Sequence, residues 1–432
     1  MLSKEKIKSS KTILCCDTEE SLGIEVYCYT ECSNSSEEII KRSRGLVYKG
    51  DKLIFEGLPY TDEYPLQDPD LQEKIEPLLA DSVIQEAYEG NIIRVFSIEN
   101  TWYITTHRKL DAFQSKWGAN KTSFGELFQC AVEHLYTTDE KLSDYLDRTE
   151  SETKSKPTKP DVHSPVRAVL ERLLASLDIH KQYMFLVSHN EENRIVSLCP
   201  QTPFVYHICT QEADGFKTIE DDDIGFPKAP VLSFSSYTEL TNYIQSVNCW
   251  TQQGVVILPR DKKRLPIKIL NDMYHYLFHL RNNEQSVKFR YLQLRNDPQG
   301  FHWFCTMYPM YLPEFQQYEQ LLAALAEDLL NAYQTRYVKG EWIVLPPDEF
   351  SILKKINEWH LEQPQENVSL DVITEIVNSR PAHHLNKIIR RRIKQDKTKS
   401  QSDCDKNTSS EVTLPESEVI LELNTKTDDD QE

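Results

Sequence analysis

The sequence contains no Cys-x-x-Cys pair, although ten cysteines occur among its 432 residues. We therefore expect reduced thiols of an intracellular protein, and a zinc site built from Cys28, Cys32 and a distant histidine is the weaker alternative. No apolar run reaches the roughly 18 residues that span a bilayer, so no membrane segment is expected. The opening stretch, MLSKEKIKSSKT, is basic but has no apolar core behind it, and we do not expect it to be a signal peptide.

Positive charge is also in short supply. Lysine and arginine number 49 against 68 aspartates and glutamates, which gives a formal net charge of −19. A chain this acidic is not a general coat for nucleic acid, because phosphate binding is electrostatic and short-ranged in salt. Any contact with nucleic acid has to come from a local basic patch.

The length and the changing pattern of the chain predict two domains and a tail. Strand-like patterns dominate up to about residue 284, helical patterns follow over 285–395, and a polar, charged tail predicted to be disordered occupies 396–432. The polar, Pro/Ser/Thr-rich stretch 148–163 is predicted to be a flexible insertion in the first domain. No internal repeat is present.

The first domain is organised around residues 84–117, which predict a β-hairpin. Strands are predicted over 91–97 and 101–106, because apolar and polar residues alternate there with the period of a strand. A Glu-Asn turn joins the two strands. The second strand ends in a dense group of donors: Thr105, Thr106, His107, Arg108 and Lys109. Without further context, a solvated basic end is as good an interpretation of this group as ligand contact.

Other elements are predicted from local patterns. Residues 69–87 favour helix, interrupted at Pro77. Residues 122–147 favour a helix that begins with a capping box, Ser123 with Glu126, and that buries an apolar stripe. We expect further strands at 182–210 (including RIVSLC, 194–199), at 254–259 and at 265–270, and helices at 236–248, 272–281, 313–336, 348–361 and 368–394.

Five short segments occur in an order that resembles a known family. They are SRGLVY (43–48), YEGNIIRVF with WYITTHRKLDAF (88–113), FLVSHNEENRIV (185–196), QGVVIL (253–258) and LPIKIL (265–270). Together they resemble the nucleotidyltransferase domain of phage-type, ATP-dependent RNA ligases, and in particular the RNA-ligase-like proteins of large cytoplasmic DNA viruses such as African swine fever virus. The resemblance covers about residues 10–280. It implies an α+β fold of mainly antiparallel sheets with flanking helices, followed here by a C-terminal helical domain and a disordered tail.

The resemblance also implies a chemistry. In such ligases a lysine attacks the α-phosphate of ATP to form lysyl-AMP, and the AMP then passes to an RNA 5′-phosphate. The lysine has to be neutral when it attacks, so burial and neighbouring cations lower its pKa. Carboxylates hold Mg²⁺, which neutralises the phosphates and aligns the attack.

This chain departs from the family at the reacting positions. The nucleophile motif, Lys-x-Asp-Gly, falls on residues 87–90, where Ala87 replaces the lysine while Glu89 and Gly90 keep the acidic residue and the glycine. The Glu-Gly-x-Val motif begins with Gln253, an amide in place of a carboxylate. The last motif keeps one of its two lysines, Lys268.

The resemblance therefore predicts a nucleotide-binding cleft with weakened chemistry. We expect its ligand contacts at the following residues: Arg44, Glu89, Gly90, Arg94, His107, Arg108, Lys109, Arg194, Gln253 and Lys268. No metal ligand is assigned, and the loss of motif carboxylates weakens the case for ATP with Mg²⁺. Lys109 and Lys268 are the candidates for a substitute nucleophile.

Three functions remain open at this point. The first is a ligase-like protein that binds nucleotides or RNA ends and has weak or absent self-adenylylation. The second is an active ATP-dependent RNA ligase with a relocated lysine, and the third is a structural or scaffolding virion protein. In each case we expect a location in the host cytoplasm or the virion and no membrane contact. The C-terminal helical domain offers room for protein partners. Its basic run, KIIRRRIK (387–394), is better explained as a solvated face than as an RNA site.

Overall fold

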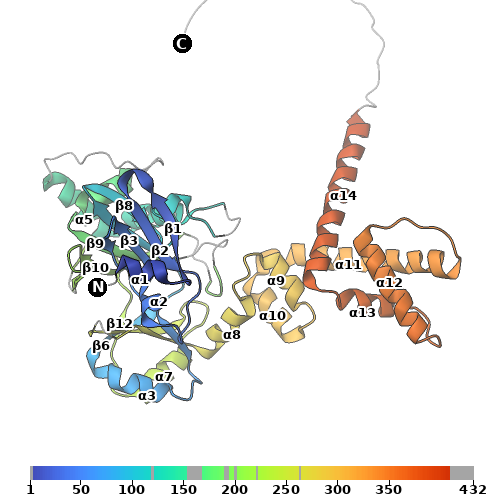
Figure 1. Ribbon diagram of the computed structural model, residues 1–432, viewed down its shortest axis with the longest axis horizontal. Coiled ribbons are helices and arrows are strands. Elements are labelled where there is room, and N and C mark those ends of the chain that lie inside the picture. The colour runs from blue at the N-terminus through green and yellow to red at the C-terminus, as the bar shows by residue number, and fades with distance from the viewer. Residues whose placement is uncertain are drawn as a thin grey trace, which may run out of the picture. The chain divides into compact units, whose positions relative to one another are not determined.

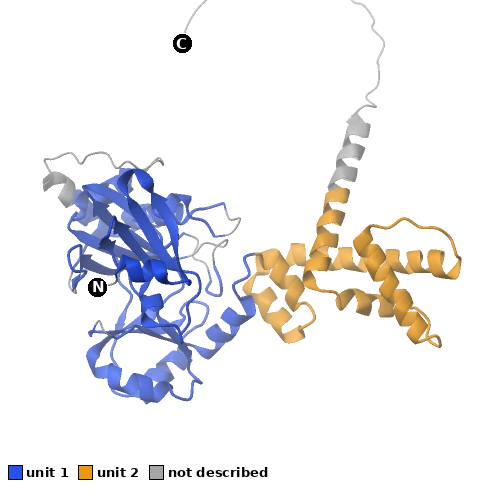
Figure 2. Cartoon of the chain, viewed as in Figure 1, with its two compact units in different colours: residues 1–285 blue, residues 286–432 orange. Residues whose placement is uncertain are grey.

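The computed structural model describes residues 3–117, 121–152, 168–188, 194–198, 202–219, 222–261 and 264–408. The chain forms two compact units, residues 1–285 and 286–432 (Figure 2). Strands and helices are mixed in the first unit, whereas the described part of the second unit is helical (Figure 1). The α+β class with mainly antiparallel sheets and a helical C-terminal region is thus confirmed.

The first sheet of unit 1 is an antiparallel meander with its strands in chain order: β1 (Ile13–Glu19), β2 (Ile24–Tyr29), β3 (Arg44–Lys49) and β4 (Lys52–Phe55). Gly50 makes the tight turn between β3 and β4 with a φ of 56°, a left-handed conformation that glycine adopts without steric cost. The sheet places Arg44 at the first position of β3.

The second sheet contains the predicted hairpin. Its strand order is β11-β10-β9-β7-β8, and the strands are β7 (Asn91–Ile98), β8 (Thr101–Thr105), β9 (Lys181–Val187), β10 (Val205–Glu212) and β11 (Thr218–Ile219). Glu99 and Asn100 both have positive φ values, 50° and 66°, as the two-residue turns that suit twisted hairpins require. The predicted strands of this hairpin are confirmed to within a residue at each end.

The third sheet has the order β12-β6-β13-β14-β5, and every pair in it is antiparallel except β14 with β5. Its strands are β5 (Asp62–Pro65), β6 (Ser82–Ala87), β12 (Val231–Leu232), β13 (Gly254–Pro259) and β14 (Ile267–Leu270). The helix predicted over 69–87 is wrong in its last third, because residues 82–87 form β6. Residues 194–198, predicted as part of a strand, form a bend instead.

Helices cover these sheets. Unit 1 contains α1 (Lys4–Ser9), α2 (Glu38–Arg42), α3 (Leu71–Ile75), α4 (Phe124–Thr138), α5 (Glu140–Glu152), α6 (Ala168–Ser176), α7 (Tyr237–Ser246) and α8 (Asp272–Arg281), with short 3₁₀ turns at Glu20–Leu22, Glu76–Asp81 and Ala112–Gln114. The predicted capping box of α4 is confirmed, since the Ser123 N–H donates to Glu126 Oε2 at 2.6 Å and the Glu126 N–H donates to Ser123 Oγ at 3.2 Å. The apolar stripe of α4 packs into the core formed with β7 and β9.

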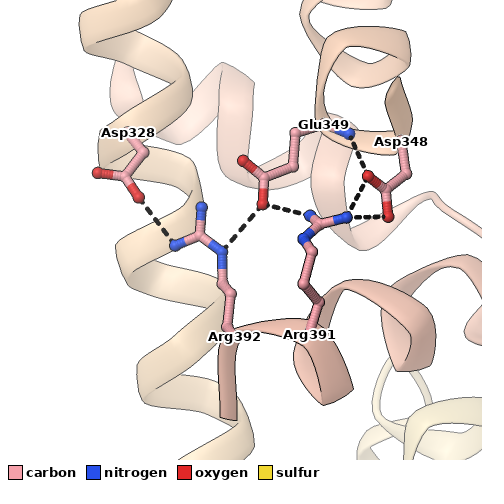
Figure 3. A network of polar contacts seen from close by, with 5 residues as sticks. All are labelled: Asp328, Asp348, Glu349, Arg391 and Arg392. Carbon is pink, nitrogen blue, oxygen red and sulfur yellow. Dashed lines mark hydrogen bonds and ion pairs between the residues drawn. The ribbon is translucent and has the colours of Figure 1, made fainter. Parts of the chain in front are cut away.

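The described part of unit 2 consists of α9 (Val287–Leu294), α10 (Pro298–Met307), a 3₁₀ turn (Pro309–Tyr311), α11 (Leu312–Tyr333), a π-helical turn (Gln334–Val338), α12 (Pro347–Glu362), α13 (Leu370–Asn378) and α14 (Ala382–Thr408). An ionic network joins α11, α12 and α14. Glu349, which is 5% exposed, accepts from Arg391 at 2.6 Å and from Arg392 at 3.1 Å, and these arginines also contact Asp348 and Asp328 (Figure 3). Two of the five basic residues in the run 387–394 are therefore engaged within the unit, so the predicted solvated face is wrong for Arg391 and Arg392.

Two predicted polar segments fall largely outside the described residues. Helix α5 continues through residue 148 to Glu152, and 153–167 are not described. Helix α14 continues through residue 396, where the sequence indicated a disordered tail, and ends at Thr408, beyond which 409–432 are not described. No helix among the described residues is long and apolar enough to cross a membrane.

Candidate functional site

The chain crosses from the third sheet to the second at residues 87–91, where β6 ends and β7 begins. Ala87 lies opposite Gly254 of β13 and is only 4% exposed. At Gly90 a side chain would not fit, because an added Cβ would lie 2.5 Å from the Val187 carbonyl oxygen. The connection thus joins two sheets at a point where the backbones approach closely, and it carries a methyl group where the ligase motif has a lysine.

Glu89, between these two residues, is engaged by donors of the protein itself. The backbone N–H groups of Ile195, Val196 and Ser197 donate to its carboxylate at 2.5, 3.0 and 3.1 Å. The Tyr274 hydroxyl donates to it at 2.8 Å. Glu89 is 7% exposed. Its hydrogen bonds to three successive amides hold the bend at 194–198 in place, and we call this set of contacts the Glu89 clamp.

Gln253 is joined to the same group. Its Nε2 donates to the Tyr274 hydroxyl at 2.7 Å, while its Oε1 is buried without a hydrogen-bond partner. Burial, reinforced by the neighbouring Glu89 carboxylate, raises the pKa of Tyr274 well above its usual value, so this hydroxyl stays protonated and remains a donor. The structure therefore brings Glu89 and Gln253 together through Tyr274, a residue that sequence reasoning missed.

This group does not fit Mg²⁺. Magnesium requires oxygen ligands in near-octahedral geometry and is usually held by one or two carboxylates. The one carboxylate here, that of Glu89, already accepts four hydrogen bonds, and Gln253 brings no charge. Nor do the described residues include any group of three or more His, Cys, Asp or Glu side chains placed to hold a metal.

A second group is formed by the predicted cations around the end of the hairpin. Arg94 on β7 is 2% exposed; its guanidinium donates to the carbonyl oxygens of Gly45 and Thr106 and, at 3.1 Å, to Thr105 Oγ1. The guanidinium carbon also lies 4.8 Å from the centre of the Phe55 ring. Burial lowers the pKa of Arg94 to about 9, which leaves it protonated at neutral pH.

His107 lies at the meeting point of these cations. Burial, followed by the charges of Arg44, Arg94 and Arg108, lowers its pKa to about 3. Within the described part of the chain, no carboxylate is among the charges that act on His107. Arg44 is half-buried, and Arg108 is exposed and donates to the Tyr29 carbonyl oxygen at 3.1 Å. The structure thus brings the positive charges of Arg44, Arg94 and Arg108 together around His107, which is neutral at pH 7.

The two candidate substitute nucleophiles are ion-paired elsewhere. Lys109 Nζ lies 3.2 Å from Asp17, whose other oxygen accepts from the Leu110 N–H. Lys268 Nζ lies 2.8 Å from Glu63 on β5. Both amines are thus engaged in ion pairs within unit 1 and do not point to a free nucleophile.

The remaining predicted residue, Arg194, is 3% exposed and belongs to the bend that Glu89 clamps. The partners named here, Asp17, Glu63 and Tyr274, had no signal in the sequence except that Tyr274 follows the capping residue Asn271 in the first turn of α8. A surface hollow in unit 2, lined by Arg336, Tyr337, Gly340, Glu341 and Trp342, contains none of the predicted ligand residues.

Comparison with known proteins identifies the family. An immediate-early protein ICP-46 homologue of Invertebrate iridescent virus 6 is 30% identical over 346 residues, which are 77% of this chain and 71% of that protein. The chain belongs to the family of immediate-early protein ICP-46 homologues. Its homologue in Invertebrate iridescent virus 3 is 26% identical over 428 residues, covering 93% of this chain and 87% of that protein. No family model matches the chain.

Similar solved structures include ATP-dependent ligases. One form of an archaeal ATP-dependent RNA ligase matches with a TM-score of 0.36 and 14% identity over 72% of this chain and 70% of that one. A mutant RNA ligase of Naegleria gruberi, solved with ATP and Mn, matches with a TM-score of 0.29 and 12% identity over 51% of this chain and 57% of that one. At these scores the likeness carries no weight in assigning a function.

Proposed function

We propose that the chain is a ligase-like protein that binds a nucleotide or the phosphorylated end of an RNA and has lost self-adenylylation. The observation that carries the binding is the arginine cluster, Arg44, Arg94 and Arg108 around His107. In a chain with a net charge of −19, three guanidinium groups without a carboxylate among them form a local site for an anion.

The geometry separates two contributions to this binding. Arg44 and Arg108 are accessible and would contact a phosphate directly, with the planar, multidentate geometry that guanidinium groups offer. Arg94 is buried and would act through its field alone. A phosphate would also relieve a cost, because a buried cation that lacks an opposite charge is expensive.

The proposed loss of self-adenylylation rests on three residues, Ala87, Glu89 and Gln253. Ala87 has no atom that could form a bond to phosphorus, Glu89 is saturated by internal donors, and Gln253 cannot supply the charge that a metal needs. Any step that depends on Mg²⁺ held by these residues is therefore left out of the proposal. Direct contacts from Glu89, Gly90, Gln253, Lys109 and Lys268 to the nucleotide remain predictions.

Binding is tested by fluorescence anisotropy with a short RNA that carries either a 5′-phosphate or a 5′-hydroxyl. We expect tighter binding of the phosphorylated RNA and a log–log salt slope that falls by about 0.7 in Arg108→Gln, the change for one phosphate contact with a single strand. Lys217→Gln is the matched control, since it removes one exposed cation of unit 1 that is not among the cluster residues. Equal affinities for the two RNAs would contradict the proposal.

The active ligase with a relocated lysine is tested separately, with labelled ATP, divalent metal and denaturing electrophoresis. We expect no covalent transfer of AMP to the protein. Transfer that disappears in Lys109→Ala or Lys268→Ala would replace our proposal with the active-enzyme alternative.

A different observation favours the structural or scaffolding alternative. Val338, Trp342 and Val344 are 70%, 82% and 85% exposed, and they lie within one short stretch of unit 2. Exposed apolar patches mark interaction surfaces more often than scattered apolar residues do. A second copy of the chain is the simplest partner to test. Sedimentation compares the intact chain with the variant Trp342→Ser. Self-association that is lost in this variant would support the alternative, and a monomer at all concentrations would count against it. The closer kinship with African swine fever virus proteins, and the host cytoplasm or the virion as location, also remain proposals.

A further inference from the structure

Helix α8 carries two histidines one turn apart, His275 and His279. Residues four apart lie on the same face of a helix, and their side chains meet. Here the two Nε2 atoms lie 2.9 Å from each other, and the ring centroids are 4.3 Å apart at an interplanar angle of 76°. Both rings thus direct the same nitrogen at one point.

We propose that His275 and His279 form a chelating site for a divalent transition metal of the Zn²⁺ class. Zinc binds imidazole nitrogen at about 2.0–2.1 Å, so two nitrogens of one tetrahedral zinc lie about 3.3 Å apart. Small rotations of the two side chains reach this separation. Without a metal, one ring donates its N–H to the other, and the metal would replace that shared proton.

Two carboxylates face the pair, and one of them, Glu63, is already ion-paired with Lys268. The carboxylates of Asp272 and Glu63 both act electrostatically on His275. Asp272 lies three residues before His275 and seven before His279, on the same face of α8, and its Oδ1 is buried without a hydrogen-bond partner. This carboxylate oxygen is available as a third ligand after a change of rotamer.

In the structure as described, only the two imidazoles converge, because no set of three or more metal-ligating side chains does so among the described residues. The protein therefore offers two nitrogens, and water or Asp272 completes the coordination. Imidazole suits Zn²⁺, Cu²⁺ and Ni²⁺, whereas Mg²⁺ requires oxygen ligands. The site thus differs in metal class from the Mg²⁺ that the ligase resemblance implies.

The site is independent of the proposed function. It lies on α8, the helix that also contributes Tyr274 to the group of Glu89 and Gln253. Tyr274, next to His275 in the sequence, is the residue that joins Glu89 and Gln253. A metal that bridges one turn of α8 would hold this helix in its folded form, because a metal bound only by the native state shifts the unfolding equilibrium.

In the test, Zn²⁺ is added to the metal-free full chain, without a polyhistidine tag, in competition with a chromophoric chelator at neutral pH. We expect one high-affinity Zn²⁺ per chain and an affinity at least about tenfold lower in His275→Ala and in His279→Ala, since even the loss of an outer-shell partner costs that much. His180→Ala is the matched control, an exposed histidine of unit 1 whose replacement should leave the affinity unchanged.

A second measurement keeps the proposal testable if a variant folds poorly. Co²⁺ in place of Zn²⁺ should give visible ligand-field bands in the unmodified chain, and these bands should be absent from the double variant of His275 and His279. Asp272→Asn should weaken Zn²⁺ binding without abolishing it. The proposal is overturned if the double variant of His275 and His279 binds Zn²⁺ as tightly as the unmodified chain, or if the unmodified chain binds none.

Discussion

Replacement of Glu89 by glutamine tests whether this residue holds the fold. The substitution keeps the size of the side chain but turns one carboxylate oxygen into an NH₂ group, which cannot accept a hydrogen bond. If that group takes the place of Oε1, the Ile195 N–H loses its acceptor, and the three donors on Oε2 lose the negative charge. An unsatisfied buried donor costs about 1–3 kcal/mol, and a neutral acceptor is weaker than a charged one by about 1 kcal/mol per bond. We expect local opening of the bend to become easier by about 3 kcal/mol.

Hydrogen exchange of the intact chain measures this opening at the amides concerned. About 3 kcal/mol corresponds to exchange faster by roughly a hundredfold at Ile195, Val196 and Ser197, since each 1.4 kcal/mol is tenfold. The neighbouring amide of Leu198 is an internal control, because it donates to the Trp250 carbonyl oxygen at 2.7 Å and does not contact Glu89. Glu86→Gln is the control variant. Unchanged exchange at the three amides in Glu89→Gln would refute the view of Glu89 as a clamp.

Two further predictions concern charge. Burial, and then Arg44, lowers the pKa of His107 to about 3. The imidazole therefore takes up a proton more readily in the unfolded chain than in the folded one. The contribution of neutral His107 to folding stability is complete above about pH 6.5 and is lost as the pH falls toward 3. Urea unfolding at pH 7 and pH 4.5 should show a loss of up to about 2–3 kcal/mol that His107→Asn reduces; an equal loss in the variant would contradict the assignment. In unit 2, Glu349→Gln should lower the stability by about 3 kcal/mol, because two guanidinium groups lose a buried partner, whereas Asp328→Asn, at a side chain that is 58% exposed, should cost less than about 1 kcal/mol (Figure 3). Similar midpoints for these two variants in urea would argue against a stabilising network.

Local patterns predicted the elements whose structure is decided locally. The hairpin of β7 and β8 follows from alternation and a turn, and the start of α4 follows from a capping box, so both are visible in the sequence. Strand β6 was missed because Gln85, Glu86 and Ala87 are good helix formers. Its conformation is set by pairing with β13 on one side and β12 on the other, and such long-range pairing outweighs propensity.

The bend at 194–198 was missed for a related reason. Its apolar residues predict a strand, but the amides of 195–197 donate to Glu89, more than a hundred residues earlier in the chain, and not to a neighbouring strand. The candidate site was predicted from the order of its motifs, and its role stays a prediction. The partners that occupy its groups, such as Asp17 for Lys109 and Glu63 for Lys268, could not be predicted, because only the folded sheets bring them together.

Glu89 and Gly90, which we predicted to match the ligase nucleophile motif, have structural reasons to be where they are. At Gly90 the Val187 carbonyl oxygen leaves no space for a side chain, and Glu89 accepts hydrogen bonds from the backbone amides of residues 195–197. Neither residue is therefore evidence that the reaction takes place. At residue 87, where the predicted motif has its lysine, the chain has a buried alanine that pairs with Gly254. The arginine cluster is the feature that points to a bound anion, since Arg94 is a buried cation for which the described residues provide no opposite charge.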